Sequence, residues 1–238
     1  MKKLAVPVFT VLGAIGFVIA IYLIFMTTPL EYGVDARTGR LAGSSLFFNQ
    51  KIFYFHIAHA IMLFIAVFVA GISSILFLWK RRPGFDDVAS ASTEVAVAFG
   101  AAVLVTGSIW AKAAWDVWWN WEPRLTMSLL LWLILVGYVL VRRFAGPSAD
   151  RVAAGMAIFG MVGVPFIYTM VGQDSHPASG ANGVVFTLGA RLLPAFLASM
   201  GAFLCWYIAL VIARIQSTRD EREVRELREQ GLDLGVLQ

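Results

Sequence analysis

The sequence predicts an all-α polytopic membrane protein whose chain crosses the bilayer six times. Of its 238 residues, 59% are hydrophobic and only 14% are charged, a composition that a water-soluble domain cannot bury. A helix needs about 20 apolar residues to cross the hydrocarbon core of a bilayer. Six stretches meet this requirement: Val6–Met26, Ile52–Trp79, Val88–Trp110, Leu125–Val141, Val152–Val171 and Leu192–Ile212.

Clusters of basic residues predict how the six spans are oriented in the membrane. With six spans, every basic cluster falls on one side of the membrane: Lys2–Lys3, Lys80–Arg82, Arg142–Arg143 with Arg151, and Arg214 onward. Positively charged segments face the cytoplasm, so we expect both termini to be cytoplasmic. Three connections then face outward: Thr27–Lys51, Ala111–Arg124 and Gly172–Arg191.

The first two spans are longer than expected for their simplest roles. The first follows Lys2 and Lys3, as a signal sequence would, but it is too long for a signal core and no small-residue cleavage site follows Met26. We therefore expect a retained anchor. The second is 28 residues long, which at about 1.5 Å per residue exceeds a ~30 Å core. Its first turns, with His56, should project outward, and His59 lies one turn deeper on the same face.

The sequence also marks the start of the fourth span and a separate segment after the sixth. Glu122 and Pro123 open the fourth span, where proline suits the first helical position and an acid complements the helix dipole. Beyond the sixth span, acids and bases spaced at i, i+4 predict a solvated charged helix. We therefore expect a six-span membrane domain, residues 1–214, followed by a cytoplasmic helical tail, residues 215–238.

The connection between the third and fourth spans is rich in tryptophan. Five of the chain's eight tryptophans lie in it or at its border: Trp110, Trp115, Trp118, Trp119 and Trp121. Tryptophan is enriched at membrane interfaces whether or not it binds a ligand, so an aromatic belt is the plainest interpretation. Anchoring needs only about one or two rings per helix end, and indole faces pack well against flat apolar bodies. We therefore favour a platform for a planar ligand.

The composition excludes several other kinds of site. The single cysteine, Cys205, lies in an apolar stretch, so this chain alone has neither a disulfide framework nor a thiolate metal cluster. It contains no C-x-x-C-H motif, so it is not itself a c-type cytochrome, and no Gly-rich phosphate loop, so an ATP-driven step would belong to a partner. The modest positive charge lies beside apolar stretches, which indicates topology and no nucleic-acid partner.

All three histidines, His56, His59 and His176, fall on the outer half of the predicted topology. Haem needs one or two axial donors, flat apolar walls and cations for its propionates, and imidazole is the usual donor. His56 and His176 are the stronger candidates, because His59 lies deeper and a helix face seldom needs two ligands. Four cations lie at the same depth: Arg124, Arg191, Lys51 and Lys112. Each could equally be a snorkelling interfacial anchor.

Three segments together resemble one family. Trp115–Thr126 (WDVWWNWEPRLT) resembles the tryptophan-rich WWD motif of haem-handling proteins, and its Arg-Leu-Thr ending is similar to that of the cytochrome c maturation protein C family, also called haem exporter protein C. Lys51–His56 (KIFYFH) resembles that family's basic-Ile-x-Tyr-x-His stretch, and Asp174–Pro177 (DSHP) resembles its second histidine loop. The chain departs from the family pattern at Glu122, where the family has Asp, and at Ala58, where proline is usual. It also lacks the tryptophan pair that often precedes the second histidine.

The resemblance implies a six-span platform that binds haem b transiently at its outer face, with His56 and His176 as axial iron ligands. The residues expected to contact haem are His56, His176, Trp110, Trp115, Trp118, Trp119, Trp121, Glu122, Arg124 and Arg191.

The resemblance also implies partners and a location. Such a protein is not an enzyme acting alone. It works beside cytochrome c maturation proteins A and B, which form an ABC transporter, and the small cytochrome c maturation protein D. It presents haem to a membrane-anchored haem chaperone, cytochrome c maturation protein E. The chaperone, to which the platform promotes covalent haem attachment, then supplies cytochrome c assembly. We expect the cytoplasmic membrane of a bacterium, with the haem site facing the periplasm or exterior.

Two other functions remain open from the residues. A membrane b-type redox cytochrome would bury haem between spans and usually needs histidine pairs at both depths, which three outward histidines do not supply. A structural component of a transporter would use the tryptophans only as a belt.

Overall fold

The computed structural model describes residues 2–28, 45–146, 149–169 and 190–234. Every regular element in these ranges is helical: α1 (Lys2–Tyr22) with a π-helical last turn η1 (Leu23–Thr27), α2 (Ser45–Lys80), α3 (Pro83–Trp115), α4 (Pro123–Phe144), α5 (Ala149–Thr169) and α6 (Leu193–Asp233). Six helices are long and apolar enough to cross a membrane. The predicted all-α fold with six spans is confirmed.

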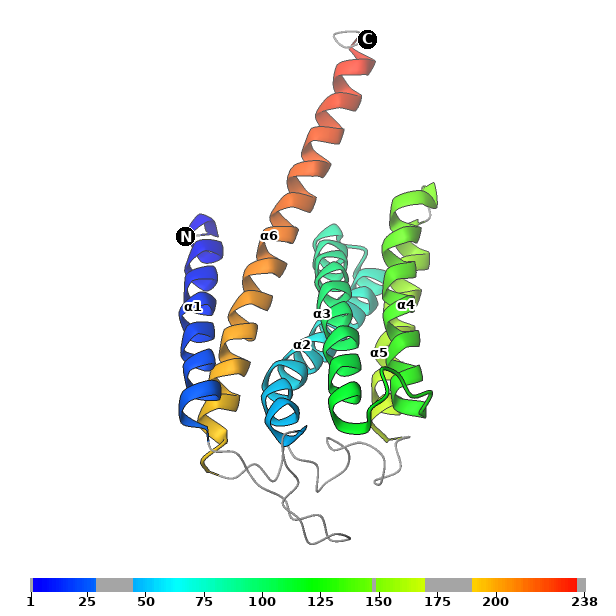
Figure 1. The fold of residues 1–238 in the computed structure, drawn as a ribbon. Coiled ribbons are helices and arrows are strands. Elements are labelled where there is room, and N and C mark those ends of the chain that lie inside the picture. Colours follow the sequence, from blue (N-terminus) through cyan, green and yellow to red (C-terminus); the bar gives the residue numbers. More distant parts are fainter. Residues whose placement is uncertain (1, 29–44, 147–148, 170–189, 235–238) are drawn as a thin grey trace, which may run out of the picture.

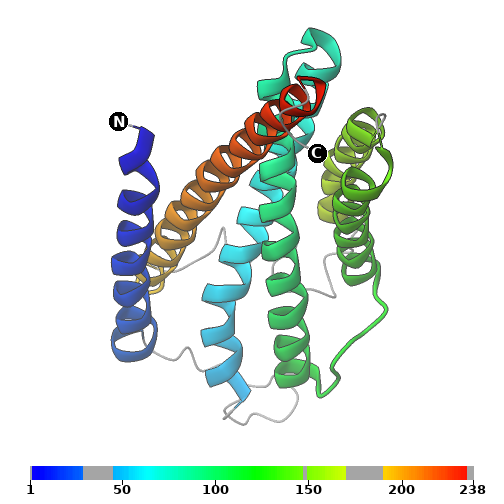
Figure 2. The same ribbon diagram turned by 90° about the horizontal axis from the view of Figure 1, so that it is seen from above.

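The helices form three neighbouring pairs (Figures 1 and 2). α1 packs along α6 on one flank, α2 and α3 form the centre, and α4 and α5 cover the other flank. The start of α1 and the end of α6 lie toward the same end of the bundle, and the connection between α3 and α4 lies at the opposite end. We name these the terminal end and the tryptophan end.

The centre is an antiparallel hairpin. Only Arg81 and Arg82 separate α2 from α3, and Arg81 makes the turn with a left-handed φ of 54°. Small side chains of the two helices are almost fully buried in one core cluster: Ala58, Ala66 and Ala96. Small residues allow close helix approach in a membrane, where packing and not hydrophobicity drives helix association.

Prolines and a left-handed residue set the helix ends beside the tryptophans. Pro123 is the first residue of α4, a position that suits proline because it has no N–H to lose there. Glu122, just before it, is extended, with a ψ of 155°. Asp116 ends α3 in the left-handed region with a φ of 59°, and its backbone N–H donates to the Lys112 carbonyl. The Lys112 ammonium also binds the Asp116 carboxylate at 2.5 Å. This ion pair lowers the pKa of Asp116, first through a hydrogen bond and then through charge.

At the terminal end, acids of α3 bind arginines from α4 and α6. Arg142 holds Asp86 with two hydrogen bonds, of 2.6 and 2.8 Å. Arg214 lies 2.6 Å from Glu94, and Arg222 binds Asp87, which is almost fully buried.

α6 is one helix from Leu193 to Asp233, with no break at the expected boundary between residues 214 and 215. It begins beside α1 at the tryptophan end and crosses the bundle to the start of α3 (Figure 2). Its first turns beyond the sixth span are therefore not a purely solvated helix, because Arg222 is bound to α3.

Candidate functional site

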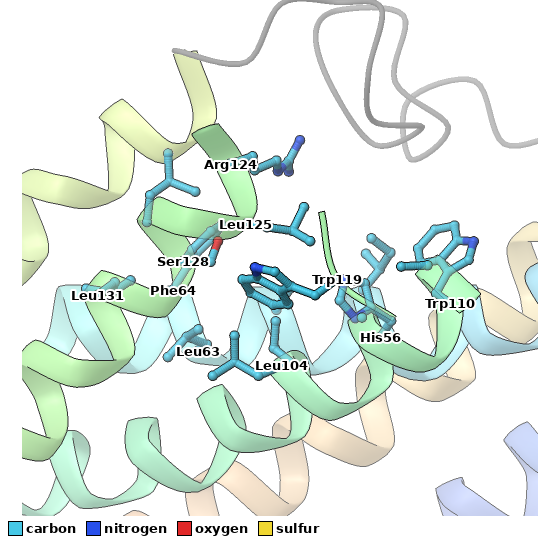
Figure 3. Close-up of a pocket in the computed structure, with 16 residues that line it drawn as sticks. His56, Leu63, Phe64, Leu104, Trp110, Trp119, Arg124, Leu125, Ser128 and Leu131 are labelled. Atoms are coloured by element: carbon cyan, nitrogen blue, oxygen red, sulfur yellow. The ribbon is translucent and has the colours of Figure 1, made fainter. Parts of the chain in front are cut away.

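A cavity of about 80 Å³ lies between α2, α3 and α4 near the tryptophan end. It is lined by four residues expected from the sequence, His56, Trp110, Trp119 and Arg124, together with apolar side chains of the three helices. Figure 3 shows the Trp119 indole in the middle of this set, with His56 and Trp110 on one side and Leu131 on the other. We name it the His56 cavity.

His56 has a fixed tautomer. Its side chain is only 8% exposed, and Nδ1 lies 3.0 Å from the hydroxyl oxygen of Thr106. Thr106 donates its own hydroxyl proton to the Ala102 carbonyl at 2.6 Å. The hydroxyl oxygen is therefore the acceptor for His56, which must donate from Nδ1–H. This leaves the lone pair on Nε2, which is the arrangement of a histidine that ligates a metal.

Two residues of α3 hold the imidazole plane. Trp110 meets His56 edge to face, with ring centroids 5.4 Å apart. A Cβ built at Gly107 would lie 3.0 Å from His56 Cε1, so a larger residue would press on the ring, and glycine lets the backbone of α3 pass close to it without displacement. Thr106 and Gly107 could not be found from the sequence, because they lie in the apolar stretch of the third span and carry no motif.

The tryptophans differ sharply in position. Trp110 is buried inside the bundle, where it also packs against Phe53. Trp119 is half-buried, and its Nε1–H is enclosed with no hydrogen-bond partner among the residues that the structure describes. Trp121 meets Trp119 edge to face at 5.8 Å. Trp118 and Trp121 are 62% and 74% exposed. The side chain of Trp115 lies outside the described part of the chain.

The charged residues at this end also separate. Arg124 lines the His56 cavity. Burial raises the pKa of Glu122, and Arg124 partly opposes this. One Glu122 carboxylate oxygen is enclosed and has no hydrogen-bond partner within the described part of the chain. Arg191 is exposed just before the start of α6 and does not line the cavity.

The other two cations expected near haem, Lys51 and Lys112, bind carbonyl and carboxylate groups of this chain. Lys51 is buried and donates to the carbonyls of Ile24 and Thr28, which ties the end of α1 to α2. Lys112 pairs with Asp116.

Of the expected iron ligands, only His56 can be placed. His176 lies outside the described residues. His59 does not line the His56 cavity. Its ring packs instead against Phe203 of α6, with centroids 4.3 Å apart.

The side chains that line the His56 cavity suit haem, but the volume of the cavity does not. Nε2 of His56 supplies an axial nitrogen, Trp119 supplies a flat wall and Arg124 supplies a cation. A cavity of about 80 Å³ holds a few water molecules and not a porphyrin. Haem could therefore reach His56 only if Trp119, which fills the middle of the set, moves with its connection.

Comparison with known proteins identifies the family. The family profile described as heme exporter protein C matches residues 1–230. Heme exporter protein C of Bradyrhizobium diazoefficiens is 32% identical over 186 residues, which cover 74% of this chain and 69% of that protein. The protein of the same name from Paracoccus denitrificans is 28% identical over 186 residues, with 74% and 75% covered. That of Escherichia coli strain K12 is 33% identical over 130 residues, with 52% and 51% covered. The chain therefore belongs to the heme exporter protein C family, whose members take part in haem delivery for cytochrome c maturation.

Proposed function

We propose that this protein binds haem at the tryptophan end, with His56 as one axial ligand, and presents it to a haem chaperone. The observation that carries the proposal is the buried His56 imidazole, whose Nδ1–H is held by Thr106 at 3.0 Å and whose Nε2 lone pair remains for iron. Trp119 and Arg124 line the same cavity. His176, from the connection between α5 and α6, would be the second axial ligand.

The geometry favours transient holding of haem. Trp118 and Trp121 are mostly exposed, so the ring would lie at the mouth of the bundle against indole faces instead of deep between helices. Only one of the two ligands sits on a described helix, and the other comes from a separate connection. An exposed porphyrin edge is accessible to a chaperone, whereas a cytochrome that keeps its haem buries the ring.

The orientation follows from charge. The turn between α2 and α3, the end of α4 and the start of α5 lie toward the terminal end. They carry Arg81, Arg82, Arg142, Arg143 and Arg151, so we assign this end to the cytoplasm. The tryptophan end would then face the periplasm or exterior of a bacterial cytoplasmic membrane. The haem chaperone, cytochrome c maturation protein E, would meet the protein there. The ABC transporter formed by cytochrome c maturation proteins A and B, with the small maturation protein D, would complete the complex.

The visible spectrum of the purified full chain with added hemin tests the iron ligands. Two histidine ligands give low-spin haem, so the parent protein should show a low-spin spectrum. His56→Ala and His176→Ala should each lose it. A low-spin spectrum that is unchanged in both variants would contradict the assignment.

A second experiment tests the tryptophan platform against a simple belt. Replacing Trp118, Trp119 and Trp121 together with Leu should lower hemin occupancy at least tenfold. Trp79→Leu is the matched control, because Trp79 is 77% exposed at the other end of the bundle. Equal hemin occupancy in the triple variant and the control would leave the tryptophans as anchors only.

A further inference from the structure

The Trp119 indole fills most of the space beside His56 in this structure. Trp119 lines the His56 cavity, and its indole lies between His56 on one side and Leu131 on the other (Figure 3). The space that remains is about 80 Å³, which admits water but no porphyrin. An indole is a flat aromatic body that packs as a porphyrin edge does. It therefore occupies part of the place that haem bound to His56 would fill.

No hydrogen bond anchors Trp119 in this position. Its Nε1–H is enclosed and has no acceptor among the described residues, and one carboxylate oxygen of Glu122, three residues further on, has no donor among them either. An enclosed polar group without a partner costs free energy that the same group recovers in water. Trp132 of α4 shows the contrast, because its Nε1–H donates to the Val97 carbonyl at 3.0 Å. The inward position of Trp119 is therefore weakly held.

The segment that carries Trp119 has few ties to the bundle. Residues 116–122, which we name the tryptophan connection, contain no helix and join the end of α3 to the start of α4. Five of their side chains are exposed: Asp116, Val117, Trp118, Asn120 and Trp121. Only Trp119 and Glu122 are half-buried. The connection can thus lift the indole out of the cavity while both helices stay in place.

We propose that Trp119 is a plug: its indole fills the His56 cavity in the haem-free protein and leaves the cavity when haem enters. This inference rests on the proposed function, because it concerns the regulation of the same site. The plug competes with haem, so the affinity for haem is reduced to the fraction of molecules in which the cavity is open. After haem is handed on, the indole returns and opposes rebinding.

The rate of haem association distinguishes a plug from a wall. A side chain that only packs against bound haem slows dissociation and leaves association unchanged, as most interface contacts do. A plug slows association, because haem binds only to the open state. Trp119 packs on the ring once it has left the cavity, so occupancy at equilibrium combines the two effects and the association rate separates them.

Chemical modification of the haem-free full chain in lipid nanodiscs tests the plug without haem. Diethyl pyrocarbonate reacts with uncharged imidazole, and mass spectrometry gives the rate at each histidine. Trp119→Ala should raise the rate at His56 roughly fivefold or more, since the cavity is then always open. The matched control is Val117→Ala, because Val117 is 43% exposed in the same connection and does not line the cavity. His59 lines a different recess and should react at the parent rate in both variants.

Stopped-flow mixing with hemin gives a second measurement. Trp119→Ala should bind hemin roughly threefold faster or more than the parent, and Val117→Ala should bind it at the parent rate. Removing a large side chain leaves a cavity that a small apolar molecule can fill. Free indole should therefore restore slow hemin association in Trp119→Ala and leave the parent rate unchanged.

Two results overturn the plug. One is a Trp119→Ala variant in which both the modification rate of His56 and the association rate of hemin equal those of the parent. The other is a variant in which modification of His56 and His59 rises alike. The proposed function fails by a different result, a low-spin hemin spectrum that is unchanged in His56→Ala and His176→Ala.

Discussion

His56 and His59 lie one turn apart on α2, yet they occupy different environments. His56 faces the cavity between α3 and α4, donates to a hydroxyl of α3 and is 8% exposed. His59 lines a different recess, between α1, α3 and α6, donates to its own helix and is half-buried. The comparison teaches that residue type and helix register do not decide a histidine's role. The neighbouring helices decide it, through the space and the partners that they provide.

The largest effect should come from adding bulk at Gly107. Gly107→Val places side-chain atoms against His56 Cε1, which a Cβ alone would already approach to 3.0 Å. We expect at least tenfold weaker hemin binding at the low-spin site, measured by spectroscopic titration. Gly155→Val is the control, because no heavy atom lies within 4 Å of a Cβ built there. If both variants behave alike, the close approach of α3 is unimportant for His56.

A smaller effect should follow from removing the partner of His56 Nδ1. Thr106→Val keeps the shape but removes the acceptor that lies 3.0 Å from Nδ1. Loss of such a hydrogen bond costs about 1 kcal/mol, so low-spin hemin affinity should fall about fivefold. Thr106→Ser should restore affinity and spectrum, since it returns the hydroxyl. Failure of Ser to rescue would show that Thr106 acts by packing.

Arg124→Ala should weaken low-spin hemin binding about threefold, because a partly exposed pair with a propionate contributes under ~1 kcal/mol. Hemin dimethyl ester has no free carboxylates, so its affinity should be equal in the variant and the parent. Arg143→Ala, an exposed arginine at the terminal end, is the control and should change neither affinity. A matching loss with the ester would exclude a role for charge.

The smallest effect concerns Glu122. Burial raises its pKa above the ordinary value of 4.5, so over a window just above pH 4.5 the folded chain holds more protons at this carboxyl than the unfolded chain. The contribution of Glu122 to stability therefore falls as pH rises through that window. Glu122→Gln should flatten this part of the pH profile of Tm and raise Tm slightly at pH 7. A profile identical to that of the parent would show that the carboxylate is not desolvated.

The spans and the general location of the site could be predicted from the sequence because they depend on local composition. Apolar length gave six helices, all of which the structure contains, and the density of tryptophan pointed to the connection between α3 and α4. His56 was found through its residue type, since imidazole is scarce in this chain.

Residue burial and the partners of the charged side chains could not be predicted, because they depend on contacts between segments that are distant in the sequence. The five tryptophans look equivalent along the chain, but only packing makes Trp110 buried and Trp121 exposed. Lys51 has the pattern of an interfacial cation, yet it binds carbonyls at the end of α1. Arg222 meets Asp87 of α3, a partner that no local charge pattern shows.

The two-residue turn at Arg81 and Arg82 means that His56 of α2 and the α3 residues that hold its ring belong to one continuous stretch of chain. Flanking parts of the molecule supply the rest of the cavity: Trp119 from the tryptophan connection and Arg124 from α4. Those outer parts can move without breaking the hydrogen bond between His56 and Thr106.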